Sequence, residues 1–220
     1  YKGTDLKGKR VIVSGSGNVA LYCLKKVSEL GGKVIAMSDS ANAIYAPDGI
    51  QFEAMRELKE DRRGRIKEYA DSHPNVEVLP SKKIWDIPCD VAFPCATQFE
   101  LDEANARKLL ENGVIGVFEG ANMPCTIEAA RVFIENGVIY SPGKASNAGG
   151  VAVSGLEIEQ NKKGEKWSFE DVDNRLKDIM ATIFRNIHKT AKELGNEYDL
   201  VKGANNYAFI GIAEKMLLRK

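Results

Sequence analysis

RVIVSGSGNVA, at residues 10–20, is the stretch of sequence that decides the fold. Residues 10–14 are short, β-branched and followed at once by glycine, which is typical of a buried strand. Residues 18–30 carry apolar side chains at spacings of three and four and end at two glycines, which indicates a helix lying on a sheet. Residues 33–37 form the next strand. The first 40 residues are therefore predicted to be a βαβ unit.

The turn between the first strand and the helix carries a GxGxxA pattern, formed by Gly15, Gly17 and Ala20. In this context Gly15 makes the tight turn, and Gly17 lets the backbone approach a pyrophosphate. The amides at the positive end of the helix bind an anion without a charged side chain. A purely structural turn is the alternative. The predicted phosphate contacts are Gly15, Ser16, Gly17, Asn18 and Val19.

Asp39 ends the second strand about 20 positions after Gly17, the spacing of a carboxylate that binds the adenosine ribose. A capping role within Ser38-Asp39-Ser40 is the alternative. A ribose carboxylate favours NAD, whereas Ser38 and Ser40 are able to donate to the 2′-phosphate of NADP. A basic run at residues 59–65 would add compensating charge, although such runs are more often solvated faces.

The rest of the chain continues the alternation and then changes character. Helices are predicted at residues 51–70, 101–111 and 126–135, and strands at residues 76–79, 90–93, 114–118 and 138–140. This pattern predicts an α/β fold with a doubly wound, mainly parallel, Rossmann-like sheet. After Gly150 only helices follow, one of them opened by Ser168 and Asp171 and the last at residues 204–218. We expect one dinucleotide-binding domain over residues 1–220, with a sheet core (1–150) and a helical tail (151–220).

The composition excludes several classes of protein. Hydrophobic residues make up 44% of the chain and charged residues 28%, as in an ordinary globular domain. The 31 basic residues balance 31 acidic ones, so the charge expected of a nucleic-acid or anionic-membrane binder is missing. Four cysteines without a CxxC pair favour reduced thiols. A cytoplasmic location is expected. Tyr1 does not resemble a natural start, which leaves room for a leader upstream.

Several motifs together resemble a known family. Their spacing and order cover nearly the whole chain, and they resemble the coenzyme domain of the small hexameric class of glutamate dehydrogenase. Four of them follow predicted strands, at the carboxyl edge where a doubly wound sheet binds its ligand. The motifs are the glycine turn, PCATQ at 94–98, EGANMP at 119–124, PGKA at 142–145, NAGG at 147–150 and VSGLE at 153–157.

The resemblance implies roles for residues that contact the cofactor. Ala96 and Thr97 would line its ribose region, Asn122 would reach the nicotinamide riboside, and Asn147 would bond the carboxamide. Without the resemblance, asparagines in such loops often serve only a turn. The Ser38-Asp39-Ser40 stretch is similar to NADP-dependent members, so NADP is expected ahead of NAD.

The resemblance also implies the reaction, which is the reversible oxidative deamination of L-glutamate to 2-oxoglutarate and ammonia. Ser154 would contribute to binding the substrate side-chain carboxylate, with Val151 beside the substrate. A serine bonded back to its own helix would look the same in sequence. In the family the catalytic lysine and aspartate come from an N-terminal domain. We therefore predict no catalytic residue here and negligible turnover of glutamate by these residues alone.

The remaining reactive side chains and the expected partners are interpreted in the light of the same resemblance. Lys144 is not assigned to catalysis, because the resemblance places its loop by the cofactor and a loop lysine is more often structural or solvated. His73 and His188 lie in polar or helical surface patterns without a partner for covalent or metal chemistry, and no metal site is predicted. The expected partners are the N-terminal domain of the same enzyme and other copies in a homohexamer. No nucleic acid or membrane is expected.

Three alternatives for the function remain open from the sequence. A stand-alone NAD(P)-sensing module would explain the missing lysines, although not the nicotinamide-end motifs. The same domain of a leucine, phenylalanine or valine dehydrogenase shares the cofactor motifs. A different enzyme on the same fold, such as an S-adenosylmethionine-dependent transferase or a short-chain reductase, is the third alternative, because doubly wound sheets host many functions.

Overall fold

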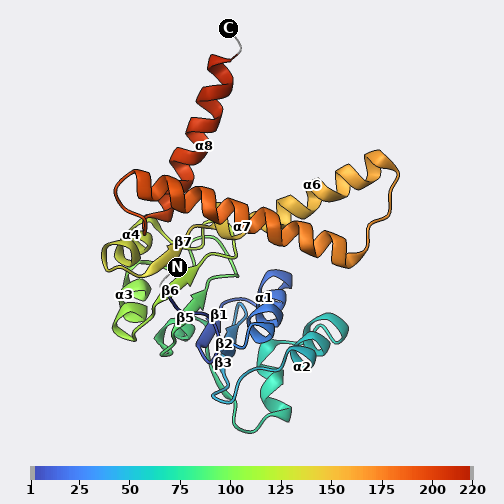
Figure 1. Cartoon of the computed structure of the whole chain (residues 1–220). Coiled ribbons are helices and arrows are strands. Elements are labelled where there is room, and N and C mark those ends of the chain that lie inside the picture. The colour runs from blue at the N-terminus through green and yellow to red at the C-terminus, as the bar shows by residue number, and fades with distance from the viewer. Residues whose placement is uncertain (1–2, 219–220) are drawn as a thin grey trace. The chain divides into compact units, whose positions relative to one another are not determined.

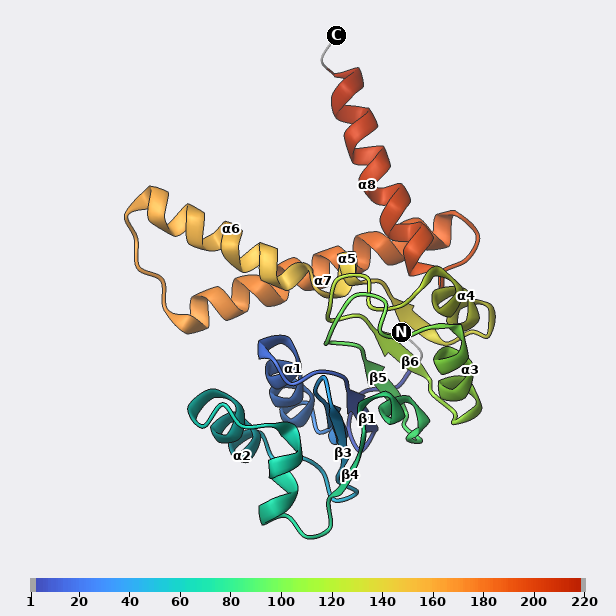
Figure 2. The same cartoon turned by 180° about the vertical axis from the view of Figure 1, so that it is seen from behind.

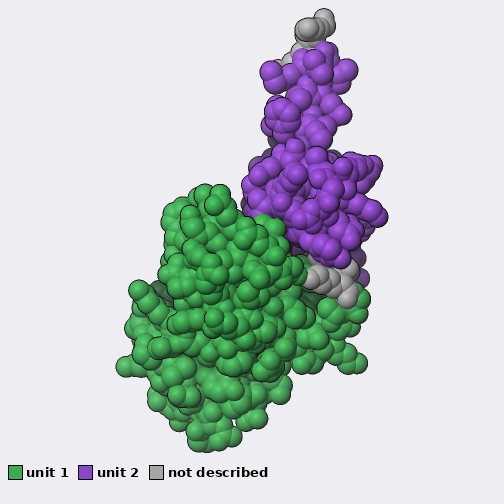
Figure 3. Space-filling model, turned by 90° about the vertical axis from the view of Figure 1, so that its left-hand side faces the viewer, with its two compact units in different colours: residues 1–139 green, residues 140–220 purple. Residues whose placement is uncertain are grey.

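The structure is a computed structural model, and it describes residues 3–218. The chain forms two compact units, of which unit 1 runs to Ile139 and unit 2 begins at Tyr140. Figure 3 colours the two units separately.

Seven strands within the described residues form one sheet, in the order β4-β3-β2-β1-β5-β6-β7. Parallel pairing joins β2 to β1, β1 to β5 and β5 to β6, whereas β3 runs antiparallel to both β2 and β4. The predicted α/β fold with a mainly parallel sheet is therefore confirmed. The strands are β1 (Arg10–Val13), β2 (Lys33–Ser38), β3 (Asn42–Tyr45), β4 (Glu77–Pro80), β5 (Val91–Phe93), β6 (Gly116–Phe118) and β7 (Ile139–Ser141).

The antiparallel strand β3 is the element that the sequence pattern did not predict. It follows a tight turn in which the Asp39 carboxylate accepts hydrogen bonds from the amides of Ala41 (2.9 Å) and Asn42 (3.0 Å). This side-chain turn reverses the chain directly after β2. Because β3 and β4 each reverse direction, β4 runs the same way as β2. Pro80, at the end of β4, therefore lies at the same edge of the sheet as Ser38.

Helices cover both faces of the sheet in unit 1. Figures 1 and 2 show α1 (Asn18–Glu29) and α2 (Phe52–Arg56) on one side, and α3 (Glu103–Glu111) and α4 (Ile127–Glu135) on the other. Residues 11–13 of β1 are completely buried between these layers. This is why the first strand is an uninterrupted β-branched run rather than an alternating one.

The helix predicted at residues 51–70 is broken into three short pieces. After α2 the chain continues as a π-helical turn, η1 (Glu57–Asp61), and then as a 3₁₀ helix, η2 (Ile66–Ser72). The break falls at Arg63, which has a positive φ of 52°, and at Gly64, whose N–H donates to Leu58 O (2.8 Å). Another 3₁₀ helix, η3 (Ser81–Asp86), follows β4.

Unit 2 is helical after β7 within its described residues. It contains α5 (Gly143–Ser146), α6 (Ala148–Lys163), α7 (Phe169–Glu193) and α8 (Leu200–Leu217) (Figure 1). The predicted cap of α7 is confirmed, because Asp171 N donates to Ser168 Oγ (3.1 Å) and Ser168 N donates to the Asp171 carboxylate (3.3 Å). α8 begins four residues earlier than predicted, since Asp199 caps it by accepting from Lys202 N (2.8 Å).

Two further features concern the chain as a whole. The four cysteines are free thiols, as expected. Among residues 3–218, none of the helices combines the length and the apolar character that crossing a bilayer requires.

Candidate functional site

A cavity of about 850 Å³ opens at the carboxyl edge of the sheet in unit 1. Its lining comes from the segments that follow β1, β2, β4 and β5. The chain order reverses between the neighbouring strands β1 and β5, and such a switch point is where doubly wound sheets bind ligands. The volume lies in the range of roughly 300–1,000 Å³ that is usual for ligand pockets.

The turn after β1 requires glycine at its first position. Gly15 has a φ of +86°, and its N–H donates to the buried Ser38 hydroxyl (3.0 Å). A Cβ on Gly15 would stand 3.1 Å from backbone atoms of Cys95 and Ala96. A Cβ on Gly17 would meet none of the described atoms within 4 Å. The second glycine therefore leaves the backbone open to a ligand, as a pyrophosphate cradle needs.

The first turn of α1 is available to an anion. Gly17 is its N-cap, and among the described residues no side chain caps this helix and no acid lies in its first turn. By contrast, the side chains of Asp102 and Thr126 cap α3 and α4. The uncapped N–H groups and the positive end of the helix dipole favour a negatively charged group beside residues 17–19.

The Asp39 carboxylate is used by the protein itself. Besides the amides of Ala41 and Asn42, it accepts from Ile66 N (3.2 Å) and lies 3.2 Å from Arg65 Nε. Only 7% of the side chain is exposed. Burial opposes its ionisation, but the three backbone hydrogen bonds and the Arg65 charge together lower the pKa of Asp39. This arrangement corresponds to the capping role that the sequence offered as the alternative to a ribose contact.

Arg65 is held beside Ser40, which is one of the residues that line the cavity. Its Nη2 donates to the Ser40 hydroxyl (3.0 Å) and to Asp39 Oδ1 (3.4 Å), and its Nε lies 3.2 Å from Asp39 Oδ2. Half of the arginine side chain is exposed. Elsewhere in the basic run, Lys59 donates to a backbone carbonyl (2.7 Å) and Arg62 pairs with an acid of η2 (3.6 Å). Of these cations, Arg65 is therefore the one brought to the serine that follows β2.

A second network joins the ends of β1 and β5 across the switch point. The Ser14 hydroxyl donates to Glu100 Oε1 (2.8 Å) and accepts from Cys95 N (2.8 Å). The same carboxylate oxygen accepts from Ala96 N (2.9 Å). Burial raises the pKa of Glu100, although the hydrogen bonds from Ala96, Ser14 and Thr97 oppose this shift. The network fixes the loop of Ala96 and Thr97 against the strand that carries the glycine turn.

Of the residues expected at the nicotinamide end and at the substrate, Asn122 is not among the lining residues, and the other three belong to unit 2. Asn122 is exposed and lies in the turn after β6. In unit 2, Asn147 joins α5 to α6, and Val151 on α6 is 74% exposed. The Ser154 hydroxyl donates back to Gly150 O (3.2 Å), the local bond that the sequence could not distinguish from a substrate contact.

Most of the expected cofactor contacts are brought together, and Lys82 and Glu100 are among the lining residues that were not expected. Lys82 follows the predicted strand at 76–79, and this position after a strand was the available signal. Glu100 carried no signal, because it is a single acid within a loop. The expected residues that line the cavity are Gly15, Ser16, Gly17, Asn18, Val19, Ser38, Asp39, Ser40, Ala96 and Thr97.

Other chemically reactive side chains have structural partners. His73 stacks on Tyr69 with 3.9 Å between ring centroids, and His188 lies 3.7 Å from Glu197. Lys144 donates to the side chain of Asn205. Between residues 3 and 218, no cluster of three or more His, Cys, Asp or Glu side chains is arranged to hold a metal ion.

Comparison with known proteins gives consistent matches over the whole chain. The family model described as "Glutamate/Leucine/Phenylalanine/Valine dehydrogenase" matches residues 1–220. A glutamate dehydrogenase of Bacteroides thetaiotaomicron is 52% identical over 98% of this chain and 49% of its own length. An NADP-specific glutamate dehydrogenase of Helicobacter pylori is 45% identical over 98% of this chain and 50% of its own. Further relatives are named NADP-specific, and one from Xylanibacter ruminicola is named NAD(P)-specific.

Solved structures give the same result. The glutamate dehydrogenase of Plasmodium falciparum superposes with a TM-score of 0.92 at 46% identity, over 96% of this chain and 46% of that one. A glutamate dehydrogenase from Thermus thermophilus, described as hetero-hexameric, superposes with a TM-score of 0.88 at 27% identity, over 100% and 49% of the two chains. The chain spans about half the length of the curated relatives it matches.

Proposed function

The chain belongs to the glutamate, leucine, phenylalanine and valine dehydrogenase family, and from this premise we propose that it is the coenzyme-binding part of an NADP-dependent glutamate dehydrogenase. The observation that carries the proposal is the cavity at the switch point, in which an open glycine turn meets the uncapped first turn of α1. The relatives from Bacteroides thetaiotaomicron and Helicobacter pylori are named glutamate dehydrogenases, which favours glutamate over leucine, phenylalanine or valine as the substrate.

The proposed reaction is the reversible oxidative deamination of L-glutamate to 2-oxoglutarate and ammonia. The nicotinamide supplies the hydride chemistry, and the protein binds and orients the two reactants. In this chain the amides of residues 17–19 bind the pyrophosphate. The Ser14–Glu100 network holds Ala96 and Thr97 against the ribose.

The adenosine end of the site favours a 2′-phosphate. Ser40 and the guanidinium of Arg65 present hydrogen-bond donors at the end of β2. The carboxylate that would otherwise bind a free 2′-hydroxyl is occupied by backbone amides and Arg65. Guanidinium groups suit phosphate because they offer charge and several donors together. This arrangement, and the NADP-specific relatives, support NADP as the cofactor.

The remaining assignments concern the nicotinamide end and the substrate. Asn122 and Asn147 are proposed to contact the nicotinamide riboside and carboxamide, and Ser154 and Val151 to face the glutamate side chain. We assign no catalytic residue to this chain, and the acid–base groups are proposed to come from the other half of the enzyme. Closure of the two halves would exclude water from the reacting carbons. We also propose a cytoplasmic homohexamer.

The test is a titration of the full-length protein that contains this chain. NADPH and NADH are added in parallel at matched ionic strength, and binding is followed by nicotinamide fluorescence. Saturable binding with a lower Kd for NADPH is expected, followed by glutamate-dependent reduction of NADP. Binding of neither dinucleotide would refute the assignment of the cavity. Binding without any reaction on glutamate, leucine, phenylalanine or valine would refute the enzyme and favour a sensing module.

A further inference from the structure

The start of η3 is attached to the turn that carries Ser40. The Ser81 hydroxyl donates to the carbonyl oxygen of Asp39 (2.5 Å), and Ser81 N donates to the carbonyl oxygen of Ala41 (3.2 Å). These two bonds bracket Ser40 on both sides along the chain. Lys82, the next residue, is therefore held close to the serine that follows β2, and it lines the same cavity.

Lys82 differs from the other cations near this turn in having no acidic neighbour. Among residues 3–218, no carboxylate lies within ion-pair distance of its ammonium group, and the side chain is exposed. Arg65 is paired with Asp39, and Lys83, the adjacent lysine, is paired with Asp86 at 2.7 Å. The Asp39 carboxylate is buried and already bonded, so it offers Lys82 no partner. An unpaired ammonium at the rim of a ligand cavity is suited to an anion.

We propose that Lys82 is a further specificity-determining residue, whose ammonium contacts the 2′-phosphate of NADP alongside Ser40 and Arg65. The inference rests on the proposed dinucleotide site. Lys82 reaches the phosphate from η3, whereas Arg65 reaches it from the start of η2, so the anion is bound by two independent elements. A lysine suits this role because it acts as a flexible point charge beside the planar, fixed arginine fork.

The contribution expected from this contact is moderate. A charge-assisted hydrogen bond to phosphate is stronger than a neutral one, but exposure to water weakens it. Removing the ammonium should therefore raise the Kd for a 2′-phosphorylated ligand about 5- to 20-fold. A ligand with a free 2′-hydroxyl should be almost unaffected, because it carries no charge at that position.

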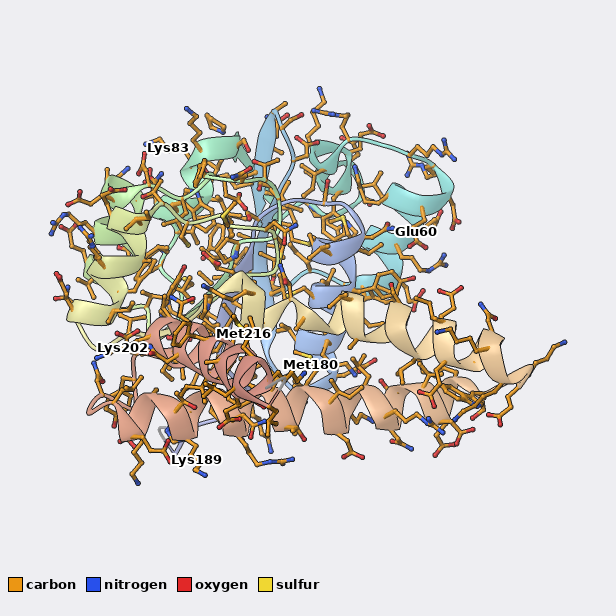
Figure 4. All side chains as sticks on the ribbon, turned by 90° about the horizontal axis from the view of Figure 1, so that it is seen from above. Glu60, Lys83, Met180, Lys189, Lys202 and Met216 are labelled. Atoms are coloured by element: carbon orange, nitrogen blue, oxygen red, sulfur yellow. The ribbon has the colours of Figure 1, made fainter. Side chains whose placement is uncertain are left out.

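The adjacent lysine provides a matched control. Lys83→Met removes a charge one residue away, from a side chain that is exposed and paired with Asp86. Figure 4 labels Lys83. Lys82→Met removes the unpaired charge at the cavity. Lys82→Arg keeps a cation there. The three variants are made in the full-length protein, and their unfolding is compared with that of the parent, so that a loss of fold is not mistaken for a loss of binding.

Binding is measured with NADPH and NADH by fluorescence, and with 2′,5′-ADP and 5′-AMP as competitors. We expect Lys82→Met to weaken NADPH and 2′,5′-ADP selectively and to lower the salt dependence of their binding. Lys82→Arg should bind close to the parent, and Lys83→Met should leave all four ligands unchanged. Equal weakening of NADPH and NADH by Lys82→Met, or no weakening of either, would overturn the inference. With either of these outcomes, the proposed function still holds if the parent protein prefers NADPH. If the parent protein binds neither dinucleotide, both the proposed function and the role of Lys82 are refuted.

Discussion

Replacing Asp39 by asparagine separates the two roles that this residue is able to play. If the carboxylate binds the ribose, its removal should weaken NADH and shift the preference toward NADPH. If the carboxylate organises the turn, as its contacts indicate, its removal should release Arg65 from Ser40 and weaken NADPH. The direction of the change in cofactor preference therefore decides between the two roles.

The stability cost of Asp39→Asn follows from the contacts that the amide is unable to replace. The side-chain oxygen of asparagine can still accept from Ala41 and Asn42. Its amino group, however, would face the N–H of Ile66 and the Arg65 guanidinium, both of which are donors. The Ile66 amide, left without its acceptor, costs about 1–3 kcal/mol. The half-exposed Arg65 pair adds at most about 1 kcal/mol, because solvent screens it.

The pH dependence of this cost has a defined sign. The pKa of Asp39 is lowered in the folded protein from its ordinary value of 3.8, so the folded state binds the proton less readily than the unfolded state. Its stabilising contribution is therefore complete above that value and is lost as the pH falls through the lowered pKa. The difference between the parent and the variant should be largest near neutral pH and shrink in acid.

The assay combines urea unfolding of the full-length protein at several pH values with NADPH and NADH titrations at neutral pH. Asp71→Asn, at an exposed position in η2, is the control for loss of a nearby negative charge. A variant that is less stable and binds NADPH less well agrees with the turn-organising role. A variant with unchanged stability and improved NADPH binding would refute this reasoning.

Two further substitutions test packing and buried charge. Glu100→Gln removes a carboxylate whose pKa is raised above 4.5 by burial in the folded protein. As the pH rises from 4.5 through this raised pKa, the parent should therefore lose stability relative to the variant. Urea unfolding midpoints of the two proteins that change in parallel between about pH 4 and 7 would contradict this. Gly203→Ala would place a Cβ 2.4 Å from the carbonyl oxygen of Ile187, forcing α8 from α7 at a cost of about 1–3 kcal/mol. Gly211→Ala on the same helix, with none of the described atoms within 4 Å, should be neutral or stabilising, and equal unfolding midpoints for the two alanine variants would refute the packing argument.

Local sequence patterns predicted the regular elements well where one face or both faces are buried. The run at residues 11–13 is uniformly apolar because helices cover both sides of β1. The helical spacing of α1 is equally clear. The pattern failed at residues 51–72, because one positive φ at Arg63 and a glycine break a helical periodicity that continues in the sequence. It also missed β3, whose existence depends on a side-chain turn rather than on periodicity.

The parts of the candidate site that directly follow predicted strands could be predicted from the sequence. The glycine turn and the Ala96 loop follow β1 and β5, and the alternation of strands and helices brings them to one edge. Glu100 was not predictable, because its importance comes from Ser14, far away in the sequence, and from burial that no local pattern reports. Lys82 could have been found from its position directly after the predicted strand at residues 76–79, because β4 ends at the same edge of the sheet as β2.

The residues that a motif assigns to the ligand are partly used here to build the site. Ser38 accepts from Gly15 and so shapes the phosphate turn, and Asp39 fixes the following turn and orients Arg65. Selectivity for the cofactor then falls to the neighbours Ser40, Arg65 and Lys82, which carry donors and positive charge. On this basis a change at Asp39 alone should not convert the site to NADH. Conversion to NADH should require two changes. The cations that face the 2′-phosphate must be removed, and a carboxylate must be introduced that accepts no hydrogen bond from a backbone amide.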